Sequence, residues 1–155
     1  MSEEILLVSK DDHVTTLTIN RPERRNALSN AMIAALRAGL DDVASDRDTR
    51  VVVLTGSGEK SFCAGGDLSD MSPADGMLDL HHQRAGFAEL LIQMQQLPQP
   101  IVGRINGDAL GGGFGLALSC DVVVAAEHSR FGTPEIKVGL FPMMIMALIQ
   151  RHVGR

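Results

Sequence analysis

The chain has 155 residues, of which 45% are apolar and 21% are charged, and its net charge is −5. This length and composition are those of a single globular domain with a buried core. The acidic balance argues against a surface for nucleic acid or for an anionic membrane, and the low aromatic content, 3% without Trp or Tyr, leaves few side chains on which a base or a sugar could stack.

Hydrophobic patterning predicts strands and helices in alternation along the chain. The predicted strands are Ile5–Val8, Val14–Ile19, Val51–Leu54, Ile101–Ile105 and Val122–Val124. The predicted helices are Leu28–Val43, Leu78–Gln96, Phe114–Leu118 and the Met-rich Phe141–Gln150. Ser29 is placed to cap the first helix, and Thr133 with Pro134 is placed to begin another helical turn. The polar segment Ser69–Gly76 is expected to be a mobile flap over a site. The sequence therefore predicts an α/β fold in one domain, residues 1–155.

Neither the cysteines nor the N-terminus indicates a metal centre or secretion. Cys63 and Cys120 lack the spacing of metal ligands, and two isolated cysteines are typical of a reducing compartment. The first residues, MSEEILLVSKDD, are acidic and contain no long apolar run, so no signal peptide is expected. No segment has the length of a transmembrane helix. We expect a cytoplasmic protein without a metal ion or a membrane anchor.

Three consecutive glycines, Gly111-Gly112-Gly113, lie between a predicted strand and a predicted helix. A backbone without β-carbons can approach a ligand closely, and the first N–H groups of a helix carry partial positive charge and have no intrahelical partner. The segment therefore suits an anion, or an oxygen on which negative charge develops, although a simple tight turn fits the same residues. No Gly-Lys-Ser/Thr and no G-x-G-x-x-G is present, which excludes a Walker loop and the dinucleotide fingerprint.

Four separated segments together carry a family resemblance. They are Asn20-Arg21-Pro22 with Asn26-Ala27-Leu28, then Cys63-Ala64-Gly65-Gly66-Asp67-Leu68, then Asn106-Gly107-Asp108-Ala109-Leu110-Gly111-Gly112-Gly113, and last Phe131-Gly132-Thr133-Pro134-Glu135 with Gly139-Leu140. With Cys120-Asp121, these segments resemble the enoyl-CoA hydratase/isomerase family, the crotonase superfamily. Each motif alone is weak, whereas four in the right order and at compatible spacing are specific.

The resemblance implies a crotonase-like (ClpP/crotonase) spiral of ββα units that acts on an acyl-CoA thioester, with coenzyme A as part of the substrate and no separate cofactor. It assigns the two N–H donors of an oxyanion hole to Gly66 and Gly112. The contacts to coenzyme A are implied for Arg24, Arg25, Ala64, Gly66 and Leu68. The guanidinium groups of Arg24 and Arg25 suit phosphate charge, but solvated loop charges would give the same sequence.

The hydratases of this family use two carboxylates, and the resemblance places one of them at Glu135 and the other at Gly115. Glycine cannot titrate, and a missing general acid or base costs roughly 10² to 10⁴ in rate. A double-bond shift needs only one base, so the sequence favours isomerisation by Glu135 over hydration, while a structural acid at a helix N-terminus stays an alternative. Asp67 is expected to hold the oxyanion turn. The groups left open as replacements for the missing carboxylate are Asp75, His81, His82 and Glu89.

Two other functions stay open at this point. A non-catalytic acyl-CoA binder or oligomerisation remnant would explain Gly115. A hydrolase on the same fold, either a thioesterase or a Clp-type serine peptidase, is disfavoured because G-x-S-x-G is absent and Ser119 lies on the wrong side of its helix. Family members continue past the position of Arg155 with helices that close the acyl pocket, so the resemblance implies a homotrimer or hexamer if that region is present. The apolar tail is expected to leave an exposed patch.

Overall fold

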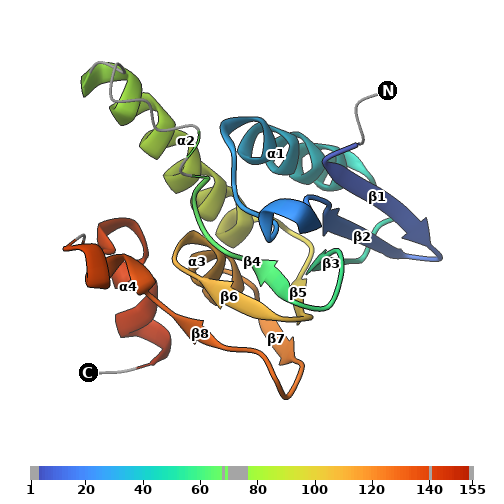
Figure 1. The fold of residues 1–155 in the computed structure, drawn as a ribbon. Helices are drawn as coiled ribbons and strands as arrows, with labels where there is room; N and C mark the ends of the chain where they lie inside the picture. The colour runs from blue at the N-terminus through green and yellow to red at the C-terminus, as the bar shows by residue number, and fades with distance from the viewer. Residues whose placement is uncertain (1–3, 68, 70–76, 140, 154–155) are drawn as a thin grey trace.

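The described residues form two sheets and four α-helices (Figure 1). The computed structural model describes residues 4–67, 69, 77–139 and 141–153. The strands are β1 Leu6–Asp11, β2 Val14–Ile19, β3 Val51–Gly56, β4 Ser61–Cys63, β5 Ile101–Ile105, β6 Asp108–Leu110, β7 Val122–Ala125 and β8 Phe131–Gly132. The helices are α1 Asn30–Ser45, α2 Met77–Gln96, α3 Gly112–Leu118 and α4 Met143–His152, with the 3-10 helices η1 Pro22–Arg24 and η3 Pro134–Val138.

From β3 onward, successive strands alternate between the two sheets. The larger sheet has the order β1-β2-β3-β5-β7, in which β1 and β2 are antiparallel and the other pairs are parallel. The smaller sheet is parallel throughout, in the order β4-β6-β8. The segments β3–β4–α2 and β5–β6–α3 are therefore each two strands in different sheets followed by a helix. This repetition confirms the predicted spiral of ββα units.

The predicted helix Leu28–Val43 is confirmed as α1, but it begins two residues later. Ser29 caps it as predicted, because its side-chain oxygen accepts a hydrogen bond of 3.1 Å from the N–H of Met32. Leu28 is extended instead of helical, since it forms a parallel bridge with Gly66. The start of α1 is thereby attached to the turn that follows β4.

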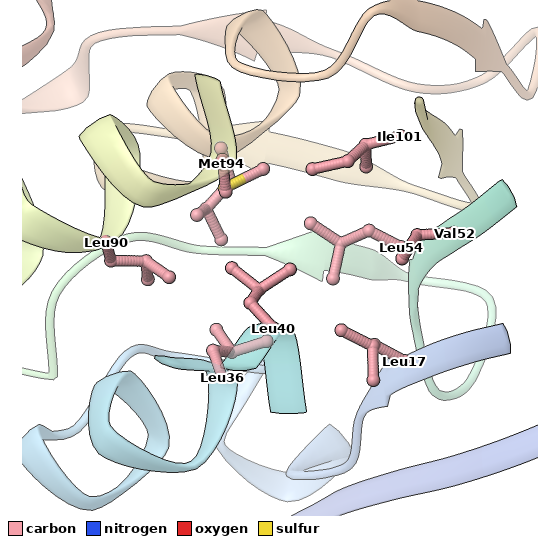
Figure 2. Close-up of a pocket in the computed structure, with 9 residues that line it drawn as sticks. Leu17, Leu36, Leu40, Val52, Leu54, Leu90, Met94 and Ile101 are labelled. Atoms are coloured by element: carbon pink, nitrogen blue, oxygen red, sulfur yellow. The ribbon is translucent and has the colours of Figure 1, made fainter. Parts of the chain in front are cut away.

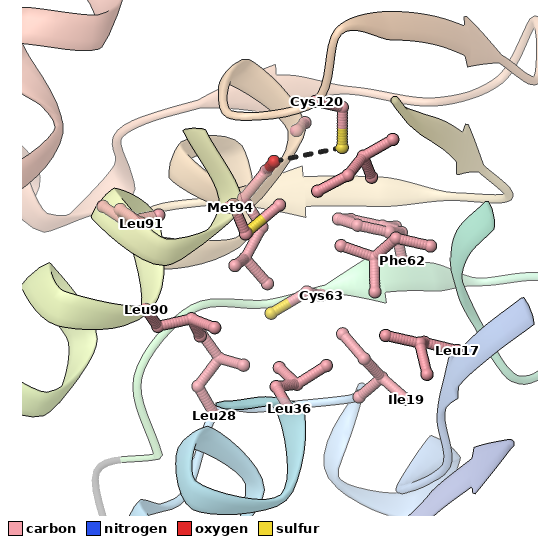
Figure 3. Packing of buried hydrophobic residues seen from close by; sticks show 14 of the residues in the cluster. Leu17, Ile19, Leu28, Leu36, Phe62, Cys63, Leu90, Leu91, Met94 and Cys120 are labelled. Carbon is pink, nitrogen blue, oxygen red and sulfur yellow. Dashed lines mark hydrogen bonds between the residues drawn. The ribbon is translucent and has the colours of Figure 1, made fainter. Parts of the chain in front are cut away.

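The core lies between the larger sheet and the helices α1, α2 and α3. Apolar side chains from all of these elements converge there, as Figure 2 shows for Leu17, Leu36, Leu40, Val52, Leu54, Leu90, Met94 and Ile101. The space left between them is only about 10 Å³ and has no polar wall. Figure 3 shows that Cys63 and Cys120 belong to this cluster, where Cys120 Sγ donates to the carbonyl of Leu116 at 3.3 Å. Burial raises the pKa of both thiols to about 12, so the two cysteines are inert packing residues.

The C-terminal helix packs beside α3 (Figure 1). The tail prediction, Phe141–Gln150, corresponds to α4, which begins after Pro142. Its residues Ile145 and Leu148 are buried, whereas Met143 and Met144 on the other side are 70% and 43% exposed. No helix within the described ranges is long and apolar enough to cross a membrane.

Candidate active site

The three parallel strands of the smaller sheet end at one edge, and each is followed directly by a turn from the predicted motifs. Parallel β4–β6 and β6–β8 pairing aligns Cys63 with Ala109 and Leu110 with Gly132. The carboxyl ends of parallel strands are where ligand sites form in α/β folds. The turns that carry Gly66, Gly112 and Glu135 are therefore brought together at this edge.

The turn after β4 presses against the turn after β6. A β-carbon at Gly65 would lie 3.0 Å from the carbonyl oxygen of Leu110 and 3.3 Å from the nitrogen of Gly112, and Gly65 has a positive φ of 97°. Glycine is needed here for both reasons, since a side chain would be strained and would separate the turns. The neighbouring residues Gly66 and Gly112 consequently lie on facing turns.

Among the described residues, the N–H groups of Gly66 and Gly112 take no part in the hydrogen bonds of the surrounding secondary structure. Gly112 is the first residue of α3, where the N–H has no intrahelical acceptor. In the bridge between Leu28 and Gly66, the N–H of Leu28 donates to the carbonyl of Gly65 at 2.8 Å, and the N–H of Asp67 donates to the carbonyl of Leu28 at 2.9 Å. The N–H of Gly66 takes no part in this bridge. Within the described chain, neither N–H donates to a protein acceptor. Two backbone donors are thus available side by side.

Asp67 anchors the turn that carries Gly66. Its carboxylate is 7% exposed, forms an ion pair of 2.8 Å with the guanidinium of Arg21 and accepts hydrogen bonds of 2.6 and 3.1 Å from the hydroxyl and N–H of Ser69. The Ser69 hydroxyl and Arg21 lower the pKa of Asp67 to about 2 against the opposing effect of burial. A carboxyl group that stays ionised and paired serves as a structural anchor, as the sequence predicted.

The loop with the basic pair is held by a buried amide. Asn26 is 1% exposed, donates hydrogen bonds of 3.0 and 2.7 Å to the carbonyls of Ser57 and Ser61, and accepts one of 3.0 Å from the N–H of Arg21. Arg25 and Asn26 both have positive φ, 53° and 56°, a conformation that Asn tolerates better than most residues. Asn26 was assigned no role from the sequence, where its one sign is the motif Asn26-Ala27-Leu28 itself.

The residues predicted to contact coenzyme A are partly brought together. The N–H of Ala64 donates to the carbonyl of Arg25 at 3.1 Å, so the basic loop lies against the end of β4. The side chains of Arg24 and Arg25 are exposed, and in the part of the chain that is described neither guanidinium pairs with a carboxylate. Both are therefore available to an anion at this edge. Leu68 lies outside the described residues.

Of the groups left open as replacements for the missing carboxylate, the described residues include the side chain of Glu89 alone, and it lies away from the glycine turns. Glu89 is 54% exposed in its side chain and pairs with Arg37 at 2.7 Å, on the surface between α1 and α2. Asp75 and most of the predicted flap lie outside the described residues, and so do the side chains of His81 and His82 in α2. Asp108, which was assigned no role, pairs with Arg130 at 2.5 Å.

Glu135 stands beside the glycine turn. The hydrogen bond of 2.8 Å from the N–H of Gly111 to the carbonyl of Gly132 holds β8 next to β6, and η3 begins two residues later. A β-carbon at Gly111 would lie 3.4 and 3.5 Å from the two carboxylate oxygens of Glu135. Oxygen Oε2 is buried and has no hydrogen-bond partner within the described chain. Thr133 occupies the predicted cap position of η3, but its side chain makes no capping bond.

The position of the missing carboxylate is filled by apolar groups. A β-carbon at Gly115 would overlap Cγ2 of Ile145 and would lie 3.5 Å from Cζ of Phe87. Ile145 comes from α4 and Phe87 from α2, and both are at most 5% exposed. No pattern in the sequence predicts this contact, because thirty positions separate Gly115 from Ile145. The described residues contain no cluster of ligands that suits a metal ion.

Comparison with known proteins agrees with the fold and the order of the motifs. The family model described as "Enoyl-CoA hydratase/isomerase" matches residues 9–155. The chain is 44% identical over 142 residues to the 2,3-dehydroadipyl-CoA hydratase of Escherichia coli, covering 92% of this chain and 53% of the relative. It is 34% identical over 139 residues to the short-chain-enoyl-CoA hydratase of Clostridium acetobutylicum, covering 88% of this chain and 52% of the relative.

Among solved structures, the enoyl-CoA hydratase of Mycobacterium smegmatis superposes with a TM-score of 0.94 at 40% identity, covering 99% of this chain and 60% of that protein. The chain thus spans about half the length of the curated relatives that it matches.

Proposed function

The chain belongs to the enoyl-CoA hydratase/isomerase family, and we propose that it is the catalytic core of an acyl-CoA enzyme that works through a thioester enolate. The observation that carries the proposal is the carboxylate of Glu135 beside Gly111, next to the N–H groups of Gly66 and Gly112. Among the described residues, one buried oxygen of Glu135 and both of these N–H groups have no hydrogen-bond partner. A base and a pair of oxyanion donors are the parts that such a reaction needs.

In the proposed complex, the thioester carbonyl oxygen accepts hydrogen bonds from Gly66 and Gly112. Removal of a proton next to the carbonyl places negative charge on that oxygen, and fixed donors stabilise the charge without reorganisation. Each such donor contributes about 3 to 4 kcal/mol in enzymes where one has been removed. The coenzyme A portion lies along Ala64 and the loop of Arg24 and Arg25, whose guanidinium groups pair with no carboxylate of the described residues and suit phosphate.

The reaction that one carboxylate supports is the shift of a double bond. Glu135 removes a proton from the carbon between the carbonyl and the double bond of a 3-enoyl-CoA, which gives a dienolate. The protonated Glu135 then returns the proton two carbons away, so that a 2-enoyl-CoA forms and the carboxylate is regenerated. No water is gained or lost in this sequence.

Hydration through two carboxylates is disfavoured because Gly115 has no side chain and the space beside it is filled by Ile145 and Phe87. A loss of roughly 10² to 10⁴ in rate is typical when one of two acid–base groups is missing. The relatives named above are hydratases, so this assignment rests on the residues of this chain.

The second candidate is an acyl-CoA binder without turnover, and Gly115 is the observation that favours it. This candidate keeps the oxyanion donors and the exposed arginines but leaves Glu135 without a catalytic task. The two candidates differ in whether a bound thioester is converted to a product.

A product assay by mass, with matched 2-enoyl-CoA and 3-enoyl-CoA substrates, tests the proposal. A shifted double bond without a change in mass is the expected result. Gain of one water from the 2-enoyl substrate contradicts single-base isomerisation, and a thioester that binds unchanged supports the non-catalytic binder.

The variant Glu135→Gln tests whether Glu135 is the catalytic base. It should lower turnover by roughly 10² to 10⁴ and leave thioester binding within a few-fold of the parent. Glu127→Gln is the matched control, because Glu127 is an exposed carboxylate on the turn after β7 and its change should have no effect. Full turnover by Glu135→Gln contradicts the role of Glu135.

A further inference from the structure

Three apolar side chains from three elements meet behind the first turn of α3. A β-carbon at Gly112 would lie 3.3 Å from Cδ1 of Leu28 and 3.3 Å from Cζ of Phe87, and one at Gly115 would overlap Ile145. The three side chains are between 3% and 5% exposed. We refer to Leu28, Phe87 and Ile145 as the apolar plug.

The apolar plug lies further along α3 than the acid. Glu135 contacts the backbone of Gly111, whereas the plug contacts Gly112 and Gly115, one residue and one helical turn further along. A thioester bound by the N–H of Gly112 has its sulfur toward Ala64 and the arginine loop, and its acyl carbons must pass Glu135. The chain of such a substrate is therefore directed along α3 toward Phe87 and Ile145.

We propose that the apolar plug limits the substrate to thioesters with a short acyl chain and that Ile145 is its specificity-determining residue. The inference rests on the proposed function, because it takes the carbonyl to be bound at Gly66 and Gly112. Ile145 occupies its place only because Gly115 has no side chain. The packing of Ile145 against Gly115 thus leaves no room for a carboxylate side chain at position 115 and also closes the acyl end of the site.

The size of the effect follows from burial of methylene groups. Ile145→Ala removes three carbon atoms from the plug and leaves an apolar cavity next to Phe87, which suits a longer chain. Each methylene that enters such a cavity improves binding about fourfold. Two added methylenes should therefore shift the preference toward the longer chain by roughly fifteenfold.

The test measures binding of saturated acyl-CoA thioesters of increasing chain length, because these ligands need no catalysis. Ile145→Ala should raise the affinity for a thioester two methylenes longer, relative to the shortest, by roughly fifteenfold. Phe87→Leu, which shortens the plug from α2, should shift this ratio in the same direction. Leu148→Ala is the matched control, since it removes the same number of carbons from a residue of α4 that is also buried, 7% exposed, one turn away.

The outcomes separate the inference from the proposed function. A chain-length profile that neither Ile145→Ala nor Phe87→Leu changes, or that Leu148→Ala changes equally, overturns the role of the plug while leaving the site intact. A parent chain that binds thioesters without turning them over overturns the proposed catalysis, but the dependence of binding on chain length can still be measured. A parent chain that binds none overturns both.

Discussion

Asp67 is the charged residue on which the Gly66 turn depends. Its carboxylate is almost fully buried and joins Arg21, from the loop before η1, to Ser69. The pKa of Asp67 is lowered from 3.8 to about 2, mainly by the Ser69 hydroxyl and then by Arg21. A group whose pKa is lower in the folded state stabilises the fold above its unfolded pKa and loses that contribution as pH falls through the folded value.

We therefore expect Asp67→Asn to destabilise the protein by about 2 kcal/mol at pH 7, since one pKa unit corresponds to about 1.4 kcal/mol. The difference from the parent should shrink as pH falls below about 4 and vanish near pH 2. Urea denaturation at a series of pH values measures it. Asp108→Asn is the control, because the Arg130 partner of Asp108 is 78% exposed, and such surface pairs contribute less than about 1 kcal/mol. A pH-independent penalty for Asp67→Asn contradicts the anchoring role.

At the residue scale, much of the candidate site follows from the sequence, and what is missing has a physical reason. Glu135 and the two glycines could be placed because they belong to short motifs at strand ends, and parallel strands end at the same edge. The contact of Ile145 with Gly115 could not be placed, because it depends on how α4 docks on α3. Asn26 was missed since a buried amide leaves no periodic signal.

At the scale of elements, the smaller sheet and α3 are fitted to each other through one glycine. A β-carbon at Gly113 would overlap the carbonyl oxygen of Cys63 in β4. The first turn of α3 therefore lies directly on the backbone of β4, which holds Gly112 against the turn of Gly65 and Gly66. The helix was predicted to begin at Phe114, but it begins at Gly112 because glycine allows this close packing.

Gly113→Ala should accordingly destabilise the protein by about 3 kcal/mol or more, since backbone cannot move aside as a side chain can. Gly86→Ala makes the same chemical change within α2, where the nearest atom to a β-carbon is Ile33 Cγ2 at 3.8 Å. That variant should be neutral or up to about 1 kcal/mol more stable, because alanine favours helix. Thermal denaturation of both variants measures the contrast, and equal stability of the two would contradict the fit.

The elements that could be predicted from the sequence are those whose apolar residues form a pattern long enough to be recognised. The five strands of the larger sheet have alternating or continuous apolar runs and α1 and α2 have apolar residues at helical spacing, and each element is present within a few residues of its predicted bounds. The smaller sheet was missed because β4, β6 and β8 have only two or three residues, too few for a period of two to be recognised. The one sign of them was the glycine or proline that follows each strand.

At the scale of the whole molecule, apolar side chains remain uncovered along one edge of the larger sheet. Strand β7 is last in the order β1-β2-β3-β5-β7, and its residues Val122, Val123 and Val124 are 53%, 43% and 60% exposed. An apolar edge strand is a template for pairing with another chain. Helix α4 also leaves apolar side chains exposed, Met143 and Met144, in keeping with the predicted apolar patch.

The opposite edge of the same sheet shows how such an edge is usually protected. Strand β1 also exposes an apolar residue, Val8, at 58%. Its neighbour Lys10 pairs with Asp46 and Asp48 at 2.7 and 2.9 Å, which places charges along the edge. Charged side chains discourage the addition of a further strand, so the two edges of the sheet should behave differently.

We expect this chain to self-associate through the β7 edge as its concentration rises. Val124→Lys places a charge in the centre of that edge and should shift association to about tenfold higher concentration, since a loss of about 1.4 kcal/mol corresponds to that factor. Val8→Lys adds the same charge at a nearly equally exposed valine of β1 and should leave association unchanged. Sedimentation velocity over a concentration series compares the three proteins. An equal effect of both substitutions would show that net charge governs association, and no association of the parent would show that the valine edge is tolerated in water.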